Sequence, residues 1–486
     1  MLETDSSGRT AVTGARSFYT NLGPIRMRNR RHAVAAAAWE WDGKRATAHT
    51  SETGLIPLYY TADSNRFVIS TSLTTIRDRA GLTSLDWPAI VTHLATGQFL
   101  GSETYVEGIH VLPLRSSLTW HDRRLEIKTA PLDIDRSELG FEAATSRYIS
   151  EVRDAVYRNL PEGPGALPLS GGRDSRHILF ELLRQGRPPD DIVTSGHYLA
   201  SSTADTKVAA NLGRRTGLAV RRVLPLSDRI SAEVHKNLLV ESMTLSHSWA
   251  LPLTKTMAAS RARFDGMNAG VLFGRSGVMV ALRSRFGDVR PQTNELVEAA
   301  IELMLDSPLA RVGEMLEPGL IVDEMVDEAR SRMRQELLRF ADYPNPLQAY
   351  LHFNHTTRDT GLFTYRMFGN PEVACPFDDL AVVRFGLGLP WSVSTDRRLQ
   401  SEALRAEFGK FADIPFAEDC IEQPASIAWD PSTEAETAVR LLNCIEAAGR
   451  FRLTERFRAS LRSGEAQLRT VQVATYLAQL LGCDDL

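Results

Sequence analysis

The chain has 486 residues, of which 43% are hydrophobic and 24% are charged, and its formal net charge is −4. This size indicates two or three domains with an ample core, and the charge balance gives no sign of a nucleic-acid partner. No apolar run reaches the roughly 18 residues that a membrane helix needs, so we expect no membrane partner. The cysteines Cys375, Cys420, Cys444 and Cys483 lack metal-binding spacing, and we interpret them as free thiols of a cytoplasmic protein.

Residues 32 to about 125 alternate between β-rich runs and turns. Ala33–Trp41 precedes a turn at Asp42-Gly43, and Ile56–Tyr60 and Arg66–Ser70 flank a turn at Asp63–Asn65. This alternation predicts an antiparallel, sheet-rich domain at the N-terminus.

A glycine-rich turn follows the apolar run Ala166–Leu169. The turn reads Ser170-Gly171-Gly172-Arg173-Asp174-Ser175, and an apolar helical pattern follows over His177–Leu183. Backbone amides, two serine hydroxyls and a helix N-terminus offer donors to a polyphosphate. Asp174 would repel a bare phosphate, so the turn also needs a cation, most simply Mg²⁺, between the carboxylate and the phosphate oxygens.

Strands and helices alternate after about residue 140, which predicts a parallel sheet with ligands at the carboxyl ends of its strands. The expected helices are Phe141–Asn159 and Asp205–Thr216, and the expected strands are Asp191–Ser195, Ala219–Leu224 and Arg261–Gly266. The tail from Thr433 to Leu481 has helical spacing and predicts a packed helical cap.

Three segments carry a family resemblance. The turn Ser170–Ser175 resembles the pyrophosphate loop of the asparagine-synthetase-like ATP pyrophosphatases. Gly54–Tyr60 resembles a strand of the glutaminase domain of asparagine synthetases, and Glu372–Asp379 resembles that family's E-x-R-x-P-F-x-D segment, with Ala374 in place of arginine. The resemblance implies an α/β protein with two parts. Residues 1–135 would be a degenerate, β-rich remnant of a class II glutamine amidotransferase (Ntn-type) domain, and residues 136–486 an adenine-nucleotide alpha-hydrolase-like synthetase domain with a parallel sheet.

The same resemblance implies a set of site residues. Asp174 would hold Mg²⁺, and Asp174 and Glu372 would be catalytic. ATP and pyrophosphate would be bound by Leu169, Ser170, Gly171, Gly172, Asp174, Ser175, Ser195, Gly196, Asp265 and Gly266.

The chain also departs from the family pattern. Leu2 follows Met1 where the family has its glutaminase cysteine, so we expect no glutamine hydrolysis. The family's second magnesium ligand falls on Gly270, and the residue that helps to deprotonate the attacking amine falls on Met267. Gln400 stands where asparagine synthetases usually have a lysine.

The resemblance implies ATP-dependent amide formation. A substrate carboxylate is adenylated, pyrophosphate leaves, and a substrate amine displaces AMP, as in lasso-peptide cyclases and beta-lactam synthetases, which points to natural-product biosynthesis. The substrates would be small molecules or peptides. The protein could form a homo-oligomer, or a partner protein could present the substrate to it. Two alternatives remain: a catalytically degenerate homologue that binds a nucleotide or a partner, and an adenylating enzyme that uses a non-amine nucleophile.

Several further residues allow two interpretations each. His352 and His355 have a spacing that suits either two metal ligands on one helix face or a packed pair. His177 and His197 are either substrate contacts or structural residues. Arg173 and Arg176 either contact phosphate or are ordinary surface charges.

Overall fold

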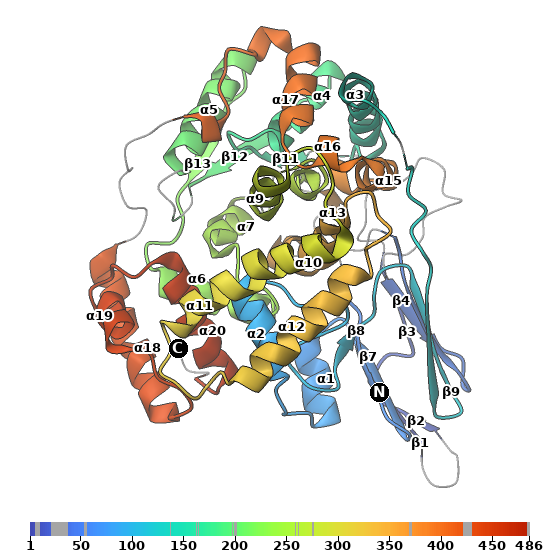
Figure 1. Ribbon diagram of the computed structural model, residues 1–486, viewed down its shortest axis with the longest axis vertical. Helices are drawn as coiled ribbons and strands as arrows, with labels where there is room; N and C mark the ends of the chain where they lie inside the picture. The colour runs from blue at the N-terminus through green and yellow to red at the C-terminus, as the bar shows by residue number, and fades with distance from the viewer. Residues whose placement is uncertain are drawn as a thin grey trace.

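The computed structural model describes residues 1–4, 10–20, 37–52, 56–136, 138–161, 163, 165–196, 198, 202–257, 259–260, 262–274, 277–368, 372–420 and 430–483. It is a mixed α/β structure with two antiparallel sheets and one parallel sheet (Figure 1). Within these residues, no helix has both the length and the apolar character needed to cross a membrane.

The two antiparallel sheets come from the N-terminal part and pack face to face. The first has the order β2-β1-β7-β6-β8, and the second has the order β10-β9-β5-β4-β3. Their strands are β1 (Leu2–Thr4), β2 (Thr10–Val12), β3 (Ser17–Thr20), β4 (Ala37–Trp41), β5 (Ala46–Thr50), β6 (Tyr59–Ala62), β7 (Arg66–Ser70), β8 (His110–Val111), β9 (Ser116–His121) and β10 (Arg124–Thr129). Phe67 of one sheet stacks on Trp120 of the other with ring centroids 5.8 Å apart, in a core that both sheets share.

Two helices interrupt these strands, which the sequence pattern did not indicate. They are α1 (Leu73–Ala80) and α2 (Trp87–Thr96). The Asp86 carboxylate caps α2 by accepting a hydrogen bond from the Ala89 amide at 3.1 Å, and the helix ends at Gly97, whose φ is +81°. This sharp end directs the chain toward the cleft described below.

The parallel sheet has the order β13-β12-β11-β14-β15, with all neighbouring pairs parallel. Its strands are β11 (Gly165–Pro168), β12 (Asp191–Ser195), β13 (Arg221–Val223), β14 (Ala262–Phe264) and β15 (Glu372–Ala374). In chain order this arrangement is 3-2-1-4-5, so the winding reverses direction between β11 and β14. The residues of β14 are buried throughout, as expected for a strand covered on both faces.

Helices surround this sheet and form the rest of the molecule. They are α3 (Phe141–Arg158), α4 (Asp174–Arg184), α5 (Ser202–Thr216), α6 (Arg229–Leu239), α7 (Leu251–Met257), α8 (Ala269–Leu272), α9 (Gly277–Phe286), α10 (Thr293–Ile301), α11 (Ser307–Gly313), α12 (Asp323–Leu338), α13 (Pro346–Leu351), α14 (Gly361–Phe368), α15 (Leu380–Gly388), α16 (Trp391–Ser394), α17 (Arg398–Glu407), α18 (Pro431–Ala448), α19 (Glu455–Arg462) and α20 (Leu468–Leu480). Short 3₁₀ turns are η2 (Ser248–Ala250), η5 (Pro376–Asp378), η6 (Gly409–Phe411) and η7 (Ala417–Asp419), and π-helical stretches are η3 (Glu302–Asp306) and η4 (His352–Thr360).

The C-terminal helices form the expected cap, at the lower left of Figure 1. A buried ion pair attaches α18 to α6: Arg229 Nε donates to Glu434 Oε2 at 2.7 Å, and both side chains are almost completely shielded from solvent.

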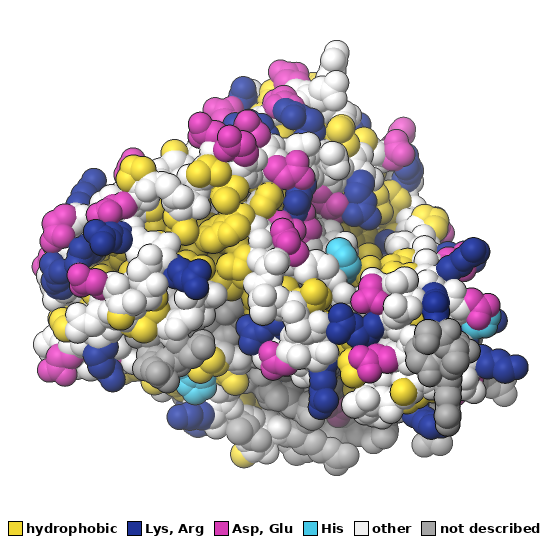
Figure 2. Space-filling model, turned by 90° about the horizontal axis from the view of Figure 1, so that it is seen from below, with side chains coloured by type: hydrophobic (Ala, Val, Ile, Leu, Met, Phe, Trp, Pro, Cys, Tyr) yellow, Lys and Arg dark blue, Asp and Glu magenta, His cyan; other side chains and the backbone are white. Residues whose placement is uncertain are grey.

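On the face seen in Figure 2, positive and negative side chains are interspersed and hydrophobic side chains gather near the centre.

The expected helices and strands of the parallel-sheet region are confirmed within a few residues at each end. Gly54 and Leu55 of the glutaminase-like segment, residues 33–36 of the first expected strand, and His197 lie outside the described residues.

Candidate functional site

A cleft of about 700 Å³ opens at the carboxyl ends of β11, β12 and β14. This is the point where the strand order reverses, and open α/β sheets bind their ligands at such points. The predicted site residues that line the cleft are Leu169, Ser170, Asp174, Ser175, Ser195, Asp265 and Gly266. Residues from three separate strand ends are therefore brought together.

The glycine-rich turn is held by its own two serines and by Asp205 of α5. The Ser170 amide donates to Ser175 Oγ at 3.1 Å, and the Gly172 amide donates to Ser170 Oγ at 3.2 Å. The Gly171 amide donates to Asp205 Oδ1 at 2.9 Å, which connects the turn to α5. These three amides are occupied inside the protein, so the donors left for a phosphate are the serine hydroxyls and the first-turn amides of α4, which have no partner within their helix.

The two glycines differ in their surroundings. A Cβ atom at Gly171 would lie 2.7 Å from Ala417 Cβ and 3.0 Å from Val208 Cβ, so this glycine packs against its neighbours. At Gly172 a Cβ atom would meet only Ser170 Oγ within 4 Å, at 3.1 Å. Gly171 therefore serves close packing, whereas Gly172 has open space beside its Cα atom. Neither of these two predicted site residues is among those that line the cleft.

Arg173 and Arg176 are directed away from the cleft into the body of the protein. Arg173 Nε donates to Ser401 Oγ at 2.7 Å, and its guanidinium lies 3.8 Å from the centre of the Phe416 ring. Arg176 is buried and donates to the carbonyl oxygens of Ile414 at 2.9 Å and Pro415 at 2.7 Å. Neither interpretation offered by the sequence fits, because both arginines fasten the turn to residues 414–418.

Asp174 and Asp265 both line the cleft, and the backbone that follows Asp265 packs on Asp174. Gly266 follows Asp265, and a Cβ atom there would lie 3.0 Å from Asp174 Cβ, so the turn after β14 packs directly on the start of α4. Asp174 Oδ1 accepts a hydrogen bond from Gln400 Nε2 at 2.8 Å. Asp265 Oδ1 accepts from the Met267 amide at 2.9 Å, and its Oδ2 lies 3.3 Å from a guanidinium nitrogen of Arg263.

These carboxylates fit a magnesium ion that is shared with a phosphate. Carboxylate oxygens are the ligands that Mg²⁺ prefers, and it usually takes only one or two of them, with water and phosphate oxygens completing its coordination. The described part of the chain holds no group of three acidic, histidine or cysteine side chains suited to a metal. None of the described residues that line the cleft is a lysine or an arginine, so a polyphosphate there needs a cation.

Ser195 and Gly196 end the strand beside the turn. Ser195 Oγ donates to the Gly196 carbonyl oxygen at 3.0 Å, and the Gly196 amide donates to Val223 O at 3.2 Å. Ser195 lines the cleft, whereas Gly196 is engaged with β13 and extends the sheet by one residue.

Met267 and Gly270, two of the positions at which the chain departs from the family pattern, lie in the cleft. Both line the cleft, and Met267 is largely buried beside Val373 and Cys375. A thioether is only a weak hydrogen-bond acceptor and cannot take up a proton. The cleft therefore lacks a base at the position where the family resemblance expects one.

Glu372 and two of the histidines lie apart from this cluster. Glu372 opens β15 level with Ala262, away from the carboxyl end of the sheet, and is not among the residues that line the cleft. Burial lowers the pKa of His177 to about 3, and His177 Nδ1 lies 3.2 Å from Tyr148 Oη, as expected for a structural residue. Burial also lowers the pKa of His352 to about 3, and its Nδ1 lies 3.1 Å from Asn268 Oδ1.

The cleft is also lined by residues that the sequence did not identify. They include the apolar side chains of Trp249, Leu253 and Phe363, which belong to one cluster with Val193 of β12, and the end of α2 contributes Ala95, Thr96 and Gln98. His247 and His355 also line the cleft. These segments are far apart in the chain, and no local motif marks them.

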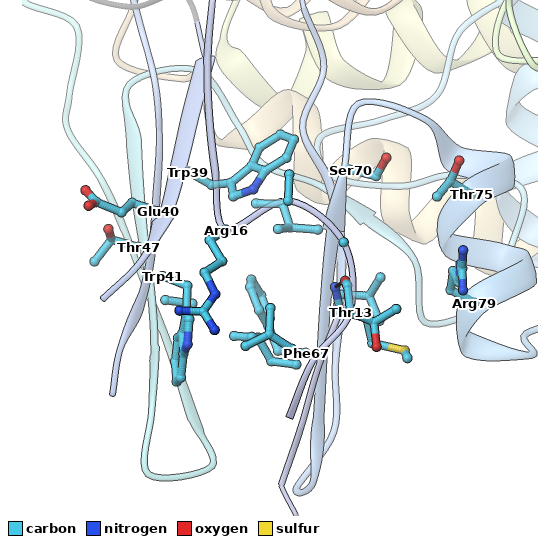
Figure 3. A pocket seen from close by; sticks show the side chains of 18 residues that line it. Thr13, Arg16, Trp39, Glu40, Trp41, Thr47, Phe67, Ser70, Thr75 and Arg79 are labelled. Carbon is cyan, nitrogen blue, oxygen red and sulfur yellow. Dashed lines mark hydrogen bonds between the residues drawn. The ribbon is translucent and has the colours of Figure 1, made fainter. Parts of the chain in front are cut away.

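A separate cavity of about 220 Å³ lies within the N-terminal part (Figure 3). Trp39 and Trp41 of β4 border it on one side and Phe67 of β7 on the other, and Arg16 extends between them. No cysteine is found among the described residues that line this cavity. All four cysteines of the chain are free thiols that lie between residues 375 and 483.

Comparison of the chain with protein-family models and with curated protein sequences returned no match. A functional assignment therefore depends on the chemistry and position of the residues in the cleft.

Proposed function

We propose that the protein is an ATP-dependent amide-forming synthetase or cyclase of the asparagine-synthetase-like type. The observation that carries this proposal is the Ser170–Ser175 turn at the carboxyl end of the central strand, in contact with the Asp265-Gly266 turn at the reversal of strand order. A glycine-rich turn that leads into a helix at such a place suits a nucleotide polyphosphate.

Asp174 and Asp265 would hold Mg²⁺ together with phosphate oxygens. When bound, the ion offsets the charge of the triphosphate and of the departing pyrophosphate. Ser170 and Ser175 are hydroxyl donors for the phosphates, and Ser195 lies at the neighbouring strand end on the adenosine side in this assignment. Gly172 leaves room for the phosphate to approach the backbone.

The reaction in this proposal has two steps. The substrate carboxylate attacks the α-phosphorus of ATP, and pyrophosphate leaves into the turn. An amine then attacks the acyl carbon, and AMP leaves. The apolar side chains of Trp249, Leu253 and Phe363 that line the cleft support an acyl substrate that carries a sizeable hydrophobic group.

The N-terminal part is proposed to be a remnant of a glutaminase domain, with its boundary at residues 135–136. Its two stacked antiparallel sheets are compatible with that assignment, and residues 130–136 and 138–140, between β10 and α3, form no helix or strand. Glutamine hydrolysis needs a thiolate, and no cysteine lines the cavity between the sheets among its described residues. The amine is therefore proposed to come from the substrate. We also propose that the protein acts in the cytoplasm.

A second candidate function is nucleotide binding without catalysis. Two observations favour it: Gly270 and Met267 line the cleft where carboxylate and base are expected, and Gln400 offers Asp174 an amide rather than an ammonium group. An adenylating enzyme that uses a non-amine nucleophile accommodates Met267 equally well.

Binding and exchange measurements test these proposals in sequence. Calorimetry with Mg²⁺ and α,β-methylene-ATP shows whether the cleft binds a nucleotide. ATP–pyrophosphate exchange with a panel of apolar N-acyl amino acids and short peptides then shows whether a carboxylate is activated. Binding without exchange favours the non-catalytic alternative, and mass spectrometry of the product distinguishes an amide from an ester.

Asp174→Ala provides the matched test of the metal assignment. We expect it to abolish exchange and to leave the thermal unfolding temperature almost unchanged. The control is Asp342→Ala, which alters an exposed aspartate outside the cleft. Exchange that survives Asp174→Ala contradicts the assignment.

A further inference from the structure

One buried carboxylate stands between two histidines of the cleft. Asp359 is 1% exposed, and its Oδ2 lies 3.5 Å from His355 Nδ1 and 3.6 Å from His247 Nε2. Both rings line the cleft that also contains Asp174 and Asp265. A carboxylate that faces an imidazole nitrogen fixes the ring and stabilises its protonated form, and contacts of this kind shorten when substrate binds.

The backbone is unusual at both histidines. His355 and Asp359 belong to the π-helical stretch η4, a rare helix type that is frequent at functional sites. His247 has a φ of +78°, in the left-handed region that non-glycine residues seldom occupy. Two segments more than 100 residues apart thus adopt uncommon conformations that bring their imidazoles to the same carboxylate.

The helical stretch η4 lies against the segment that contains Met267. Thr356, next to His355, donates from Oγ1 to Asn268 Oδ1 at 3.1 Å, and His352 Nδ1 lies 3.1 Å from the same oxygen. Further along, Thr364 Oγ1 lies 3.4 Å from Asp265 Oδ2. His355 is therefore a near neighbour of the position at which the amine-activating residue is missing.

The charges around Asp359 keep it ionised. Burial favours its neutral form, but His247, His355 and Lys236 outweigh this effect and lower the pKa of the carboxyl below its usual value. Lys236 Nζ lies 2.9 Å from Glu233 Oε2 and donates to the Thr244 carbonyl at 2.8 Å, and the Thr244 hydroxyl donates to Asp359. The acceptor needed to orient an imidazole N–H is thus always present.

His355 lines the cleft, and its surroundings favour the neutral imidazole. Although 37% of its side-chain surface is exposed, protein surrounds the rest of the ring, and this desolvation lowers its pKa. Asp359 opposes that shift and His247 adds to it. A neutral imidazole whose Nδ1–H points to a carboxylate presents Nε2 as a proton acceptor.

We propose that His355 is the general base of the amide-forming step, positioned by Asp359. This inference rests on the proposed function. The amine nitrogen attacks the acyl carbon of the adenylate, the new C–N bond forms, and the nitrogen passes one proton to His355 Nε2. The bond between the acyl carbon and the phosphate oxygen breaks, and AMP leaves with that electron pair. Asp359 stabilises the resulting imidazolium, and His247 faces the same carboxylate oxygen.

His355→Gln tests the base while pyrophosphate exchange serves as the internal control. The probes are the acid from the panel that gives the fastest exchange with the unaltered protein and phenethylamine as the amine. We expect exchange to stay within about twofold and amide formation to fall by about 10²–10⁴-fold, the usual loss on removing a general base. Added imidazole should restore part of the rate with His355→Ala. The matched control is His110→Gln, an exposed histidine of β8 that is far from this machinery in the sequence.

Asp359→Asn tests positioning through the pH profile of the same step. Loss of the carboxylate lowers the pKa of His355, so the acidic limb of the amide-forming rate should move to lower pH and the plateau rate should fall. Amide formation within threefold of the unaltered rate in His355→Gln, with exchange intact, overturns the assignment of His355. Absence of exchange in the unaltered protein overturns the proposed function and this inference with it, so the two failures are distinguishable.

Discussion

Alanine substitutions at the two glycines of the turn should separate protein packing from ligand approach. Gly171→Ala would place a Cβ atom 2.7 Å from Ala417 Cβ, 3.0 Å from Val208 Cβ and 3.2 Å from Asp205 Cα. None of these atoms is the end of a flexible side chain, so the turn must move. Overpacking of this kind costs about 1–3 kcal/mol. With an unfolding entropy of about 2.1 cal/mol/K per residue, that cost lowers the unfolding temperature of the whole chain by about 1–3 °C.

Gly172→Ala should behave differently, because its added methyl group meets only the rotatable Ser170 hydroxyl within 4 Å. We expect an unfolding temperature within about 1 °C of the unaltered protein, together with at least about a tenfold loss of affinity for magnesium α,β-methylene-ATP, or about 1.4 kcal/mol. Gly171→Ala should lose both stability and affinity. Differential scanning calorimetry and titration calorimetry measure the two quantities. Full affinity in Gly172→Ala would refute the placement of the phosphates at this turn, and unchanged stability in Gly171→Ala would refute the packing argument.

Two predictions concern stability away from the turn. Glu434→Gln leaves the buried Arg229 guanidinium without its charged partner and should lower the free energy of unfolding by about 3–5 kcal/mol, measured by denaturant titration. The control is Glu298→Gln, at the exposed pair with Arg334, which should lower the free energy of unfolding by at most about 1 kcal/mol. Burial raises the pKa of Asp378 from 3.8 to about 7 in the fold. A raised carboxyl pKa means that this group's stabilising contribution is complete below pH 4 and is lost as the pH rises through 7. Asp378→Asn should therefore raise the free energy of unfolding at pH 8 by up to about 4 kcal/mol, with a corresponding rise in the unfolding temperature, and should leave both nearly unchanged at pH 4. An equal effect at both pH values would contradict this reasoning.

Much of the parallel sheet was predictable because each of its parts is encoded locally. The apolar runs at β11 and β12 are short, and polar or glycine residues bound them, so their limits were found within one residue. The helices of the N-terminal part were not predicted. α2 is rich in apolar residues and is buried over almost its whole length, so its sequence has no one-sided period that would distinguish a buried helix from a strand.

The turn itself was predictable as a site, but not the function of each residue in it. From the sequence, Arg176 could be either a phosphate contact or a surface charge, whereas its guanidinium is buried and donates to the carbonyl oxygens of residues 414 and 415. These two partners of Arg176 lie more than 200 residues away in the chain. The contact between His247 and Asp359 could not be predicted from the sequence either, because only the tertiary structure brings these segments together.

The acidic lining of the cleft explains why the proposed reaction needs both a magnesium ion and a proton acceptor. Asp174, Asp205 and Asp265 line it, and no lysine or arginine does so among its described residues. In a partly enclosed cleft, attraction between opposite charges is several times stronger than in bulk water. Such a cleft favours a cationic amine and a magnesium-bound nucleotide and disfavours a free polyphosphate. An amine that is drawn in as an ammonium ion must lose a proton before it can attack, and Met267 cannot accept one. The same acidic lining that attracts the proposed substrate therefore makes another proton acceptor necessary. His355 lines the cleft beside the buried Asp359 carboxylate, and burial lowers the pKa of its imidazole, which favours the neutral ring that can accept a proton.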